Sequence, residues 1–222
     1  SGNLGIGTSS PAAKLNAYGA TSYAGLNVQA VLSDSTAMAA GTGGVLAFEG
    51  KYSGSSLANY AAIGGLKENS TSGNYSGYMA FYTRSDGSLP AERMRLDSSG
   101  NLGLGVTPSG WSGLKAFELG SGTGITAGGI NLIGFNNTYY NGTNWIYKTS
   151  DYSTRFVTND SGRFIWYQAT SGTAGSAISF TQAMTLDASS RLGIGNTSPN
   201  HRLTLGVYGD SSNYIRVLAS NA

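Results

Sequence analysis

The sequence predicts an all-β fold, in which short strand modules follow one another along an elongated chain. Glycine accounts for 34 of the 222 residues, about twice its usual share, whereas charged residues make up only 11%. The 40% hydrophobic and 11% aromatic residues indicate a chain that folds. No sustained apolar stripe of helical period is present, and the best helical candidate, residues 111–119, contains Gly113 and allows one turn at most.

Short segments of alternating or β-branched and aromatic residues predict the strands. Clusters of Gly, Ser, Asn and Asp bound each of them, which is typical of turns. The predicted strands are residues 45–48, 78–82, 145–147, 164–167, 178–180 and 203–205.

A glycine-leucine motif recurs three times and indicates a modular chain. It reads Leu-Gly-Ile-Gly at residues 4–7 and 192–195 and Leu-Gly-Leu-Gly at 102–105. Residues 94–100 (MRLDSSG) and 184–190 (MTLDASS) precede the last two copies in matching positions. A proline follows each copy: Pro11, Pro108 and Pro199.

Each such junction is predicted to form a short β-hairpin. Met-x-Leu is an extended segment, Asp-x-Ser-Gly is turn chemistry, and the motif alternates with period two. Glycine at every second position allows another backbone to approach one face, while the apolar residues share the other face. These apolar residues are the candidates for a subunit interface: Leu4, Ile6, Leu102, Leu104, Leu192 and Ile194.

The repeat divides the chain into four parts. We expect a junction hairpin at residues 1–17, one β module at 18–101, a second at 102–191, and at 192–222 a junction with the start of a third module. Such short strands expose many edges, which symmetric association covers. We therefore expect an elongated homo-oligomer; the alternative is a monomeric sandwich or solenoid.

Four stretches resemble the repetitive shaft and distal regions of tailed-bacteriophage tail fibre proteins, in which a GNLGIGTxxP junction separates β-rich modules. These stretches are residues 2–15 (GNLGIGTSSPAAKL), 94–105 (MRLDSSGNLGLG), 139–149 (YYNGTNWIYKT) and 184–199 (MTLDASSRLGIGNTSP). Two departures stand out. Ser190-Arg191 replaces Gly-Asn in the third junction, which removes the residue best suited to a positive φ, and Pro108 is followed by Ser-Gly-Trp where the other junctions have a basic residue and leucine further on.

The resemblance implies a parallel homotrimer of interwoven β-structure, of the β-prism or β-helix type. It implies a virion component outside the cell, with other tail proteins and a host surface glycan or receptor as partners. Related fibres often end in a self-cleaving intramolecular chaperone domain of the endosialidase type. We expect that domain to be absent from this chain, which looks like a fragment or processed piece. A bacterial surface adhesin or filament subunit is an alternative origin.

Composition argues against several other classes. The sequence contains no cysteine, so it has no disulfide and no thiolate ligand or nucleophile. The net charge of +2 gives no polybasic footprint for nucleic acid. No apolar run approaches the roughly 20 residues that span a bilayer, so no membrane insertion is expected.

Motifs for enzyme chemistry are weak, and we expect no catalytic, cofactor or metal site. Residues 122–127 fit G-x-G-x-x-A, but Gly128-Gly129 follows where a dinucleotide site needs a helix. His201 is the single histidine and no G-x-S-x-G elbow accompanies it. The carboxylates are scattered, without the clustered oxygens of a hard-cation site.

Two sugar-related interpretations stay open. A polysaccharide depolymerase uses a pair of carboxylates held several ångströms apart, for which Asp86 with Glu92, or Asp151 with Asp160, are the candidates. Aromatic side chains also stack on sugar rings, although strand packing is their commoner role. The glycan-contact candidates are Tyr139, Tyr140, Trp145 and Tyr147.

Overall fold

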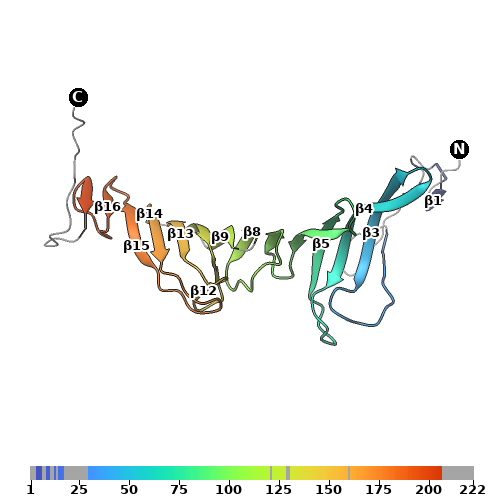
Figure 1. Cartoon of the computed structure of the whole chain (residues 1–222), viewed down its shortest axis with the longest axis horizontal. Coiled ribbons are helices and arrows are strands. Elements are labelled where there is room, and N and C mark those ends of the chain that lie inside the picture. Colours follow the sequence, from blue (N-terminus) through green and yellow to red (C-terminus); the bar gives the residue numbers. More distant parts are fainter. Residues whose placement is uncertain are drawn as a thin grey trace, which may run out of the picture. The chain divides into compact units, whose positions relative to one another are not determined.

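The computed structural model describes residues 4–6, 9–10, 13, 15–17, 30–120, 122–128, 131–159 and 161–206. Every regular element in these ranges is a strand, which confirms the predicted all-β class (Figure 1). None of the described residues forms a helix of the length and apolar character needed to cross a bilayer. The chain divides into two compact units, residues 1–79 with 84–90 and residues 80–83 with 91–222.

A long antiparallel hairpin dominates the first unit. Its strands are β3 (Gly43–Ser53) and β4 (Ser56–Lys67), and the turn between them places Gly54 at a φ of +55°. The pairing register shifts after Phe48 and again after Lys51. The other strands of this unit are β1 (Leu4–Ile6), β2 (Leu15–Ala17) and the first residues of β5 (Gly77–Thr83).

Both faces of the β3–β4 hairpin carry exposed apolar side chains. Val45 lies on one face and Leu46 on the other, and each is about half exposed. Among the described residues of this unit, only Leu66 is both apolar and buried. Strands become stable when a hydrophobic face is covered, and the described residues of this unit leave both faces of the hairpin open. The described part of the first unit therefore has no core of its own.

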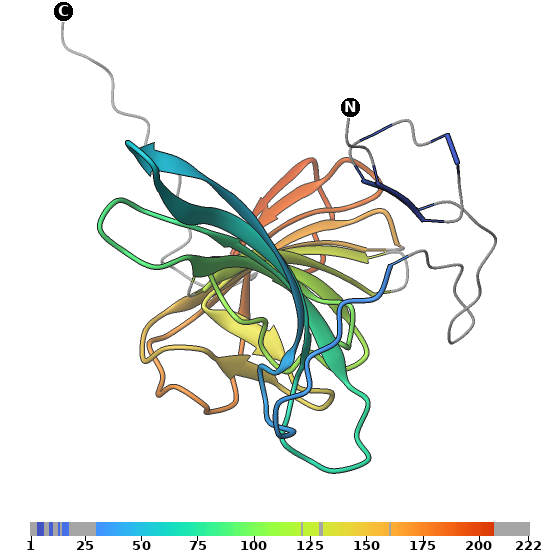
Figure 2. The same cartoon turned by 90° about the vertical axis from the view of Figure 1, so that its right-hand side faces the viewer.

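The second unit contains a sheet in which strands follow chain order, interrupted once by a side hairpin (Figure 1). Within this unit the order is β17-β16-β15-β14-β13-β10-β9-β8-β7-β6. Neighbouring strands are turned relative to one another, as the twist of sheets requires (Figure 2). The bounds are β6 (Ala91–Leu96), β7 (Leu102–Leu104), β8 (Lys115–Leu119), β9 (Thr123–Gly128), β10 (Asn131–Asn136), β13 (Ser153–Thr158), β14 (Phe164–Ala169), β15 (Thr181–Leu186), β16 (Leu192–Ile194) and β17 (Leu203–Leu205).

The side hairpin pairs β11 (Thr138–Tyr140) with β12 (Trp145–Tyr147) and covers one face of this sheet. Trp111, Ala116 and Phe135 form a buried cluster beneath it. The Trp111 ring lies 5.0 Å from that of Phe135 and meets the rings of the hairpin edge-on. Aromatic pairs of this kind supply much of the apolar contact in a small core.

The second and third junctions share one pairing pattern. β6 pairs antiparallel with β7, as β15 does with β16, which confirms the two predicted hairpins. The motif strand then pairs in parallel with the strand that follows, β8 or β17. Residues 105–114 and 195–202 make these connections, which are shorter than the crossover that parallel strands usually need.

The predicted hairpin at residues 1–17 is wrong for the two strands found there. Leu4 faces Leu15 and Ile6 faces Ala17, and the pairing of β1 with β2 is parallel. β2 thus runs in the same direction as β1, just as β8 and β17 run in the same direction as the motif strands β7 and β16.

Most predicted strands are confirmed, and one is wrong. Residues 45–48, 78–82, 145–147, 164–167 and 203–205 lie in β3, β5, β12, β14 and β17. Residues 178–180 form no strand, because Ile178 donates a single backbone hydrogen bond to Trp145 and β15 begins only at Thr181. The predicted modules at 18–101, 102–191 and 192–222 follow the sequence repeat and stay a prediction.

Candidate functional site

One face of the sheet in the second unit is apolar and is left uncovered by the residues that the structure describes. In β8 burial alternates, so that Glu118 is buried while Phe117 and Leu119 are 37% and 41% exposed. Side chains of residues directly opposite one another lie on the same face of a sheet. Phe117 has Leu102 opposite on one side and Ile125 on the other. The exposed side of β8 therefore continues onto its neighbours.

The pairing registers extend this face from β6 to β17, and we call it the apolar sheet face. Its members are Leu96, Leu102, Leu104, Phe117, Leu119, Ile125, Leu132, Phe156, Phe164, Trp166, Met184, Leu186, Leu192, Ile194, Leu203 and Leu205. Exposure of its most open side chains runs from 37% to 49%. A soluble monomer rarely exposes an apolar patch of this extent, which marks an interaction surface.

Of the residues predicted as interface candidates from the motifs, Leu4, Ile6, Leu104 and Ile194 are exposed, and Leu102 and Leu192 are half-buried. Leu102, Leu104, Leu192 and Ile194 all belong to the apolar sheet face. Leu4 and Ile6 share one face of β1 in the first unit and are about 60% exposed. What contacts these side chains in an assembly stays a prediction.

On the covered face of this sheet, buried polar side chains stand among buried apolar ones such as Phe135 and Ile165. Thr126 and Thr185 are fully buried, whereas their neighbours Ile125 and Leu186 lie on the apolar sheet face. Buried polar groups and exposed apolar patches are unusual in folded proteins, so they say more about a protein than a buried apolar or an exposed polar residue does. The largest fully buried side chains are all polar: Glu118, Asn101, Thr126, Thr138, Thr185 and Ser153.

The motif glycines allow the backbone to pack closely against the opposite face of the sheet. A Cβ added to Gly103 would lie 2.1 Å from the carbonyl oxygen of Val106, and one added to Gly193 would lie 2.4 Å from that of Asn196. The backbone that approaches the glycine face is thus the chain's own connection to the next strand. The Cδ atoms of Pro108 and Pro199 would lie 3.0 Å and 3.4 Å from these added Cβ atoms.

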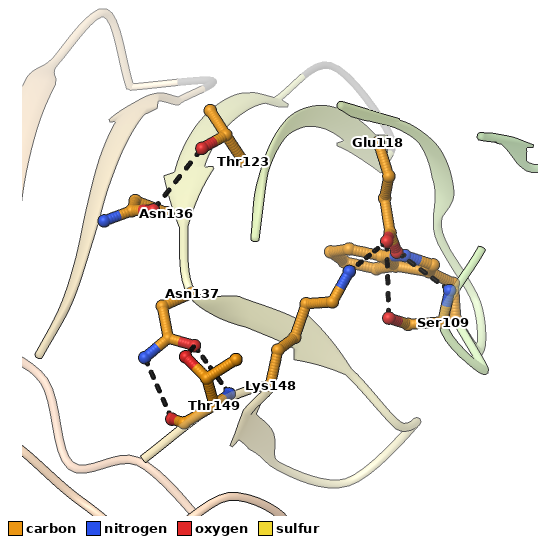
Figure 3. Close-up of polar contacts among 8 residues, drawn as sticks. Ser109, Glu118, Thr123, Asn136, Asn137, Lys148 and Thr149 are labelled. Atoms are coloured by element: carbon orange, nitrogen blue, oxygen red, sulfur yellow. Dashed lines mark hydrogen bonds and ion pairs between the residues drawn. The ribbon is translucent and has the colours of Figure 1, made fainter. Parts of the chain in front are cut away.

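Glu118 organises the polar layer on the covered face (Figure 3). Its carboxylate accepts hydrogen bonds from the backbone N–H of Ser109 (3.0 Å), from Trp111 Nε1 and from Lys148 Nζ. The side chains of Glu118 and Lys148 are 0% and 10% exposed, so the pair is an internal ion pair. It joins β8, the connection 105–114 and the residue that follows β12.

Asn137 fixes the entry to the side hairpin (Figure 3). It has a positive φ of 57°, and its amide is fully used. Nδ2 donates to the carbonyl oxygens of Thr149 (3.1 Å) and Tyr152 (2.9 Å), while Oδ1 accepts from the N–H and hydroxyl of Thr149. The side-chain amide of Asn137 thus supplies hydrogen-bond partners to backbone groups of Thr149 and Tyr152, which lie outside the strands.

The predicted glycan-contact residues lie inside or beside the core. Tyr147 is 5% exposed and donates its hydroxyl to the carbonyl oxygen of Thr170, so its ring is not available to a sugar. Tyr139, Tyr140 and Trp145 are partly buried against the Trp111 cluster. Each of the three rings contacts a neighbouring aromatic ring in an edge-on or tilted arrangement. Glycan contact at Tyr139, Tyr140 and Trp145 stays a prediction, beside their part in strand packing.

Arg155 lies among aromatic rings and was not singled out by any motif. Its guanidinium carbon lies 4.9 Å from the centroid of Trp145 and 4.4 Å from those of Tyr167 and Phe180. Burial lowers the pKa of Arg155 below its ordinary value, and Tyr167 partly opposes that effect. These contacts hold the segment 178–180 against the sheet through cation–π attraction.

The residues considered for enzyme chemistry lie in several strands and turns. Glu92 accepts two hydrogen bonds from Arg95, each of 2.7 Å, and Asp160 lies outside the described residues. His201 is exposed. Residues 122–127, the dinucleotide-like sequence, continue into strand β9 where a helix would be needed. Within the described ranges, no three His, Asp or Glu side chains gather as metal ligands.

Comparison with known proteins finds similarity in structure only. No protein family and no curated protein matches the sequence. Two solved structures of a bacteriophage tail fibre resemble this chain. One is the carboxy-terminal domain of the bacteriophage T5 L-shaped tail fibre with its intramolecular chaperone domain, at 14% identity and a TM-score of 0.45 over 92% of this chain and 67% of that one. The other is the carboxy-terminal domain alone, at 14% identity and a TM-score of 0.44 over 99% of this chain and 98% of that one.

Proposed function

We propose that this chain is a structural and host-attachment segment of a phage tail fibre, assembled as a parallel homotrimer on the apolar sheet face. The exposed apolar sheet face carries the proposal, because large apolar residues such as Phe117 and Ile125 are exposed while their neighbour Glu118 is buried. Covering that face with further copies of the same chain removes it from water. The recurring junctions, which resemble those of tail fibres, supply the biological setting.

Three copies suit this chain for two reasons. The apolar sheet face needs a partner, and the β3–β4 hairpin, apolar on both faces, needs partners on two sides. A threefold assembly gives every copy two neighbours. It also presents three equal sets of outer loops to a repetitive host surface, so that weak contacts act together. The attachment itself involves no bond cleavage, and the ligand is a host surface glycan or protein.

The mass of the particle in solution tests the assembly. Native mass spectrometry should give three copies of the 22.8-kDa chain. Ile125→Asp places a charge on the apolar sheet face and should shift the particle to single chains, because Ile125 is 49% exposed within its own chain. Thr173→Asp, at an exposed loop position away from that face, is the matched control. A wild-type protein that stays a single chain at micromolar concentration contradicts the proposal, and a dimer contradicts the threefold symmetry.

Cell binding and sugar release test attachment. Fluorescently labelled protein is incubated with whole cells from a panel of bacterial strains, and bound protein and released reducing sugar are measured in the same samples. We expect saturable binding to some strains without sugar release. Release that Asp151→Asn or Glu92→Gln abolishes would instead support a depolymerase.

A further inference from the structure

The third junction differs from the second at its turn, and a polar hollow of about 430 Å³ lies beside the difference. The hollow is formed where β14 and β16 begin and β15 ends, together with the connection that precedes β17. Among its lining residues are Arg163, Asp187, Ser189, Arg191, Ser198 and Asn200. Two arginines and several hydroxyls thus converge with one carboxylate.

That one carboxylate is already fully engaged. Oδ2 of Asp187 accepts from Arg191 Nε (2.8 Å) and lies 2.7 Å from Nη2 of the same guanidinium. Oδ1 accepts from the backbone N–H groups of Ser189 (2.9 Å) and Arg191 (3.0 Å). Asp187 therefore balances Arg191 and has no capacity left for a second cation.

Arg163 supplies a positive charge that no described residue of the hollow balances. Its Nη2 donates to the carbonyl oxygen of Thr197 (2.5 Å), which is a neutral acceptor. Its Nε is buried and makes no hydrogen bond. No carboxylate forms an ion pair with Arg163 within the described part of the chain. An arginine held in this way, with donors left over, favours an anionic acceptor.

The second junction shows that the repeat does not require this arrangement. Asn101 stands there in the position of Arg191, is 1% exposed, and uses its amide on Asp97 (3.0 Å) and on the backbone N–H of Ala116 (3.1 Å). That amide is neutral and is buried against β8. The arginine at residue 191 is therefore a local feature of the third junction, beyond what the hairpin needs.

We infer that this hollow binds an oxyanion, a carboxylate or phosphate group, between Arg163 and Arg191, with the hydroxyls of Ser189 and Ser198 as further donors. Charge-assisted hydrogen bonds from guanidinium groups are the strong interactions available for such a group. On a host surface the anion would be the acidic group of a saccharide or a phosphate ester; that biological source rests on the proposed attachment role, whereas the binding itself does not.

Calorimetric titration of the full chain tests the site with two probes, sodium glucuronate and inorganic phosphate. Saturable heat with either is expected, and the probe that binds more tightly identifies the carboxylate or the phosphate as the natural group. Glucose at equal concentration, and sodium chloride at matched ionic strength, should give no saturable heat. Arg163→Gln should weaken binding by roughly tenfold or more, since one charge-assisted hydrogen bond is lost.

Two further variants keep the test decisive. Arg191→Asn installs the residue of the second junction and should also weaken binding roughly tenfold while the hairpin keeps its turn. Arg202→Gln removes an exposed arginine outside the hollow and should leave binding unchanged. Equal binding by wild type and Arg163→Gln, or no saturable binding by wild type of either probe, overturns the inference. Calorimetry tests the oxyanion site and native mass spectrometry tests the trimer, so a negative result for one proposal is distinguishable from a negative result for the other.

Discussion

Ser190 holds in the third junction the backbone conformation that Gly100 holds in the second. Their φ angles are +59° and +80°, and each donates its N–H to the carbonyl oxygen of the aspartate that opens the turn, over 3.0 Å. Glycine adopts such angles freely, whereas a residue with a Cβ does so at a cost. The turn is conserved in shape between the two junctions although its residue has changed.

Ser190→Gly is therefore expected to stabilise the protein. Relief of the left-handed strain outweighs the greater freedom of glycine in the unfolded chain, for a net gain of about 0.5–1 kcal/mol. Urea unfolding at one fixed protein concentration measures it. Gly100→Ser, the matched reverse change, should lower the free energy of unfolding by a similar amount. Equal midpoints for all three proteins would contradict the strain argument.

The motif glycines predict a much larger effect. Gly193→Ala introduces a Cβ 2.4 Å from a backbone carbonyl oxygen, which cannot move without displacing the connection to β17. We expect a loss of about 2–4 kcal/mol in the free energy of unfolding, in the upper range for single substitutions. Gly110→Ala, where no atom lies within 4 Å and φ is not positive, is the control and should change stability by less than about 0.5 kcal/mol. A Gly193→Ala protein as stable as the control would refute the close approach.

The repeat and the period-two pattern are sufficient to predict the strands and the two junction hairpins. They do not predict the parallel partner of each motif strand, because that pairing depends on where the connection after the proline brings the chain back. Glycine spacing did indicate a close backbone approach, but sequence alone does not say that the approaching carbonyl, at Val106 or Asn196, belongs to the same junction.

The orientation of β8 shows why the candidate site was only partly predictable. Its sequence, Lys-Ala-Phe-Glu-Leu, suggests burial of Phe117 and Leu119 in a single chain, yet Ala116 and Glu118 are the buried residues. Alternation tells which side chains share a face, but not which face the rest of the chain covers. Here Trp111 and the β11–β12 hairpin decide it, and no local pattern marks Trp111 as the partner of Glu118.

The internal ion pair gives a third prediction. Glu118→Gln leaves the Lys148 ammonium without its carboxylate and should cost about 3–5 kcal/mol of unfolding free energy, as when one partner of a buried pair is removed. Glu92→Gln breaks the more exposed pair with Arg95 and should cost about 1 kcal/mol or less. Thermal unfolding followed by circular dichroism measures both at one protein concentration.

A second variant separates charge from packing at this pair. Glu118→Gln combined with Lys148→Met removes both charges and should recover part of the stability lost by Glu118→Gln alone. If the double variant is less stable than the single one by the full cost of Lys148→Met, the two side chains are not coupled.

The turn aspartate of the third junction gives a prediction for pH. The pKa of Asp187 is held below its ordinary value of 3.8, chiefly by the hydrogen bond from the Arg191 side chain, with backbone N–H groups adding to it and burial opposing it. A carboxyl group whose pKa is lower in the folded state binds protons more readily when unfolded, so its contribution to stability is present above pH 3.8 and is lost as the pH falls through the folded pKa. Asp187→Asn should accordingly be less stable than wild type at neutral pH, and the difference should shrink in urea unfolding series taken from about pH 5 down to about pH 2.5. A difference that stays constant over that range would mean that Asp187 stabilises the turn through its shape alone, and not through the charge that Arg191 recognises.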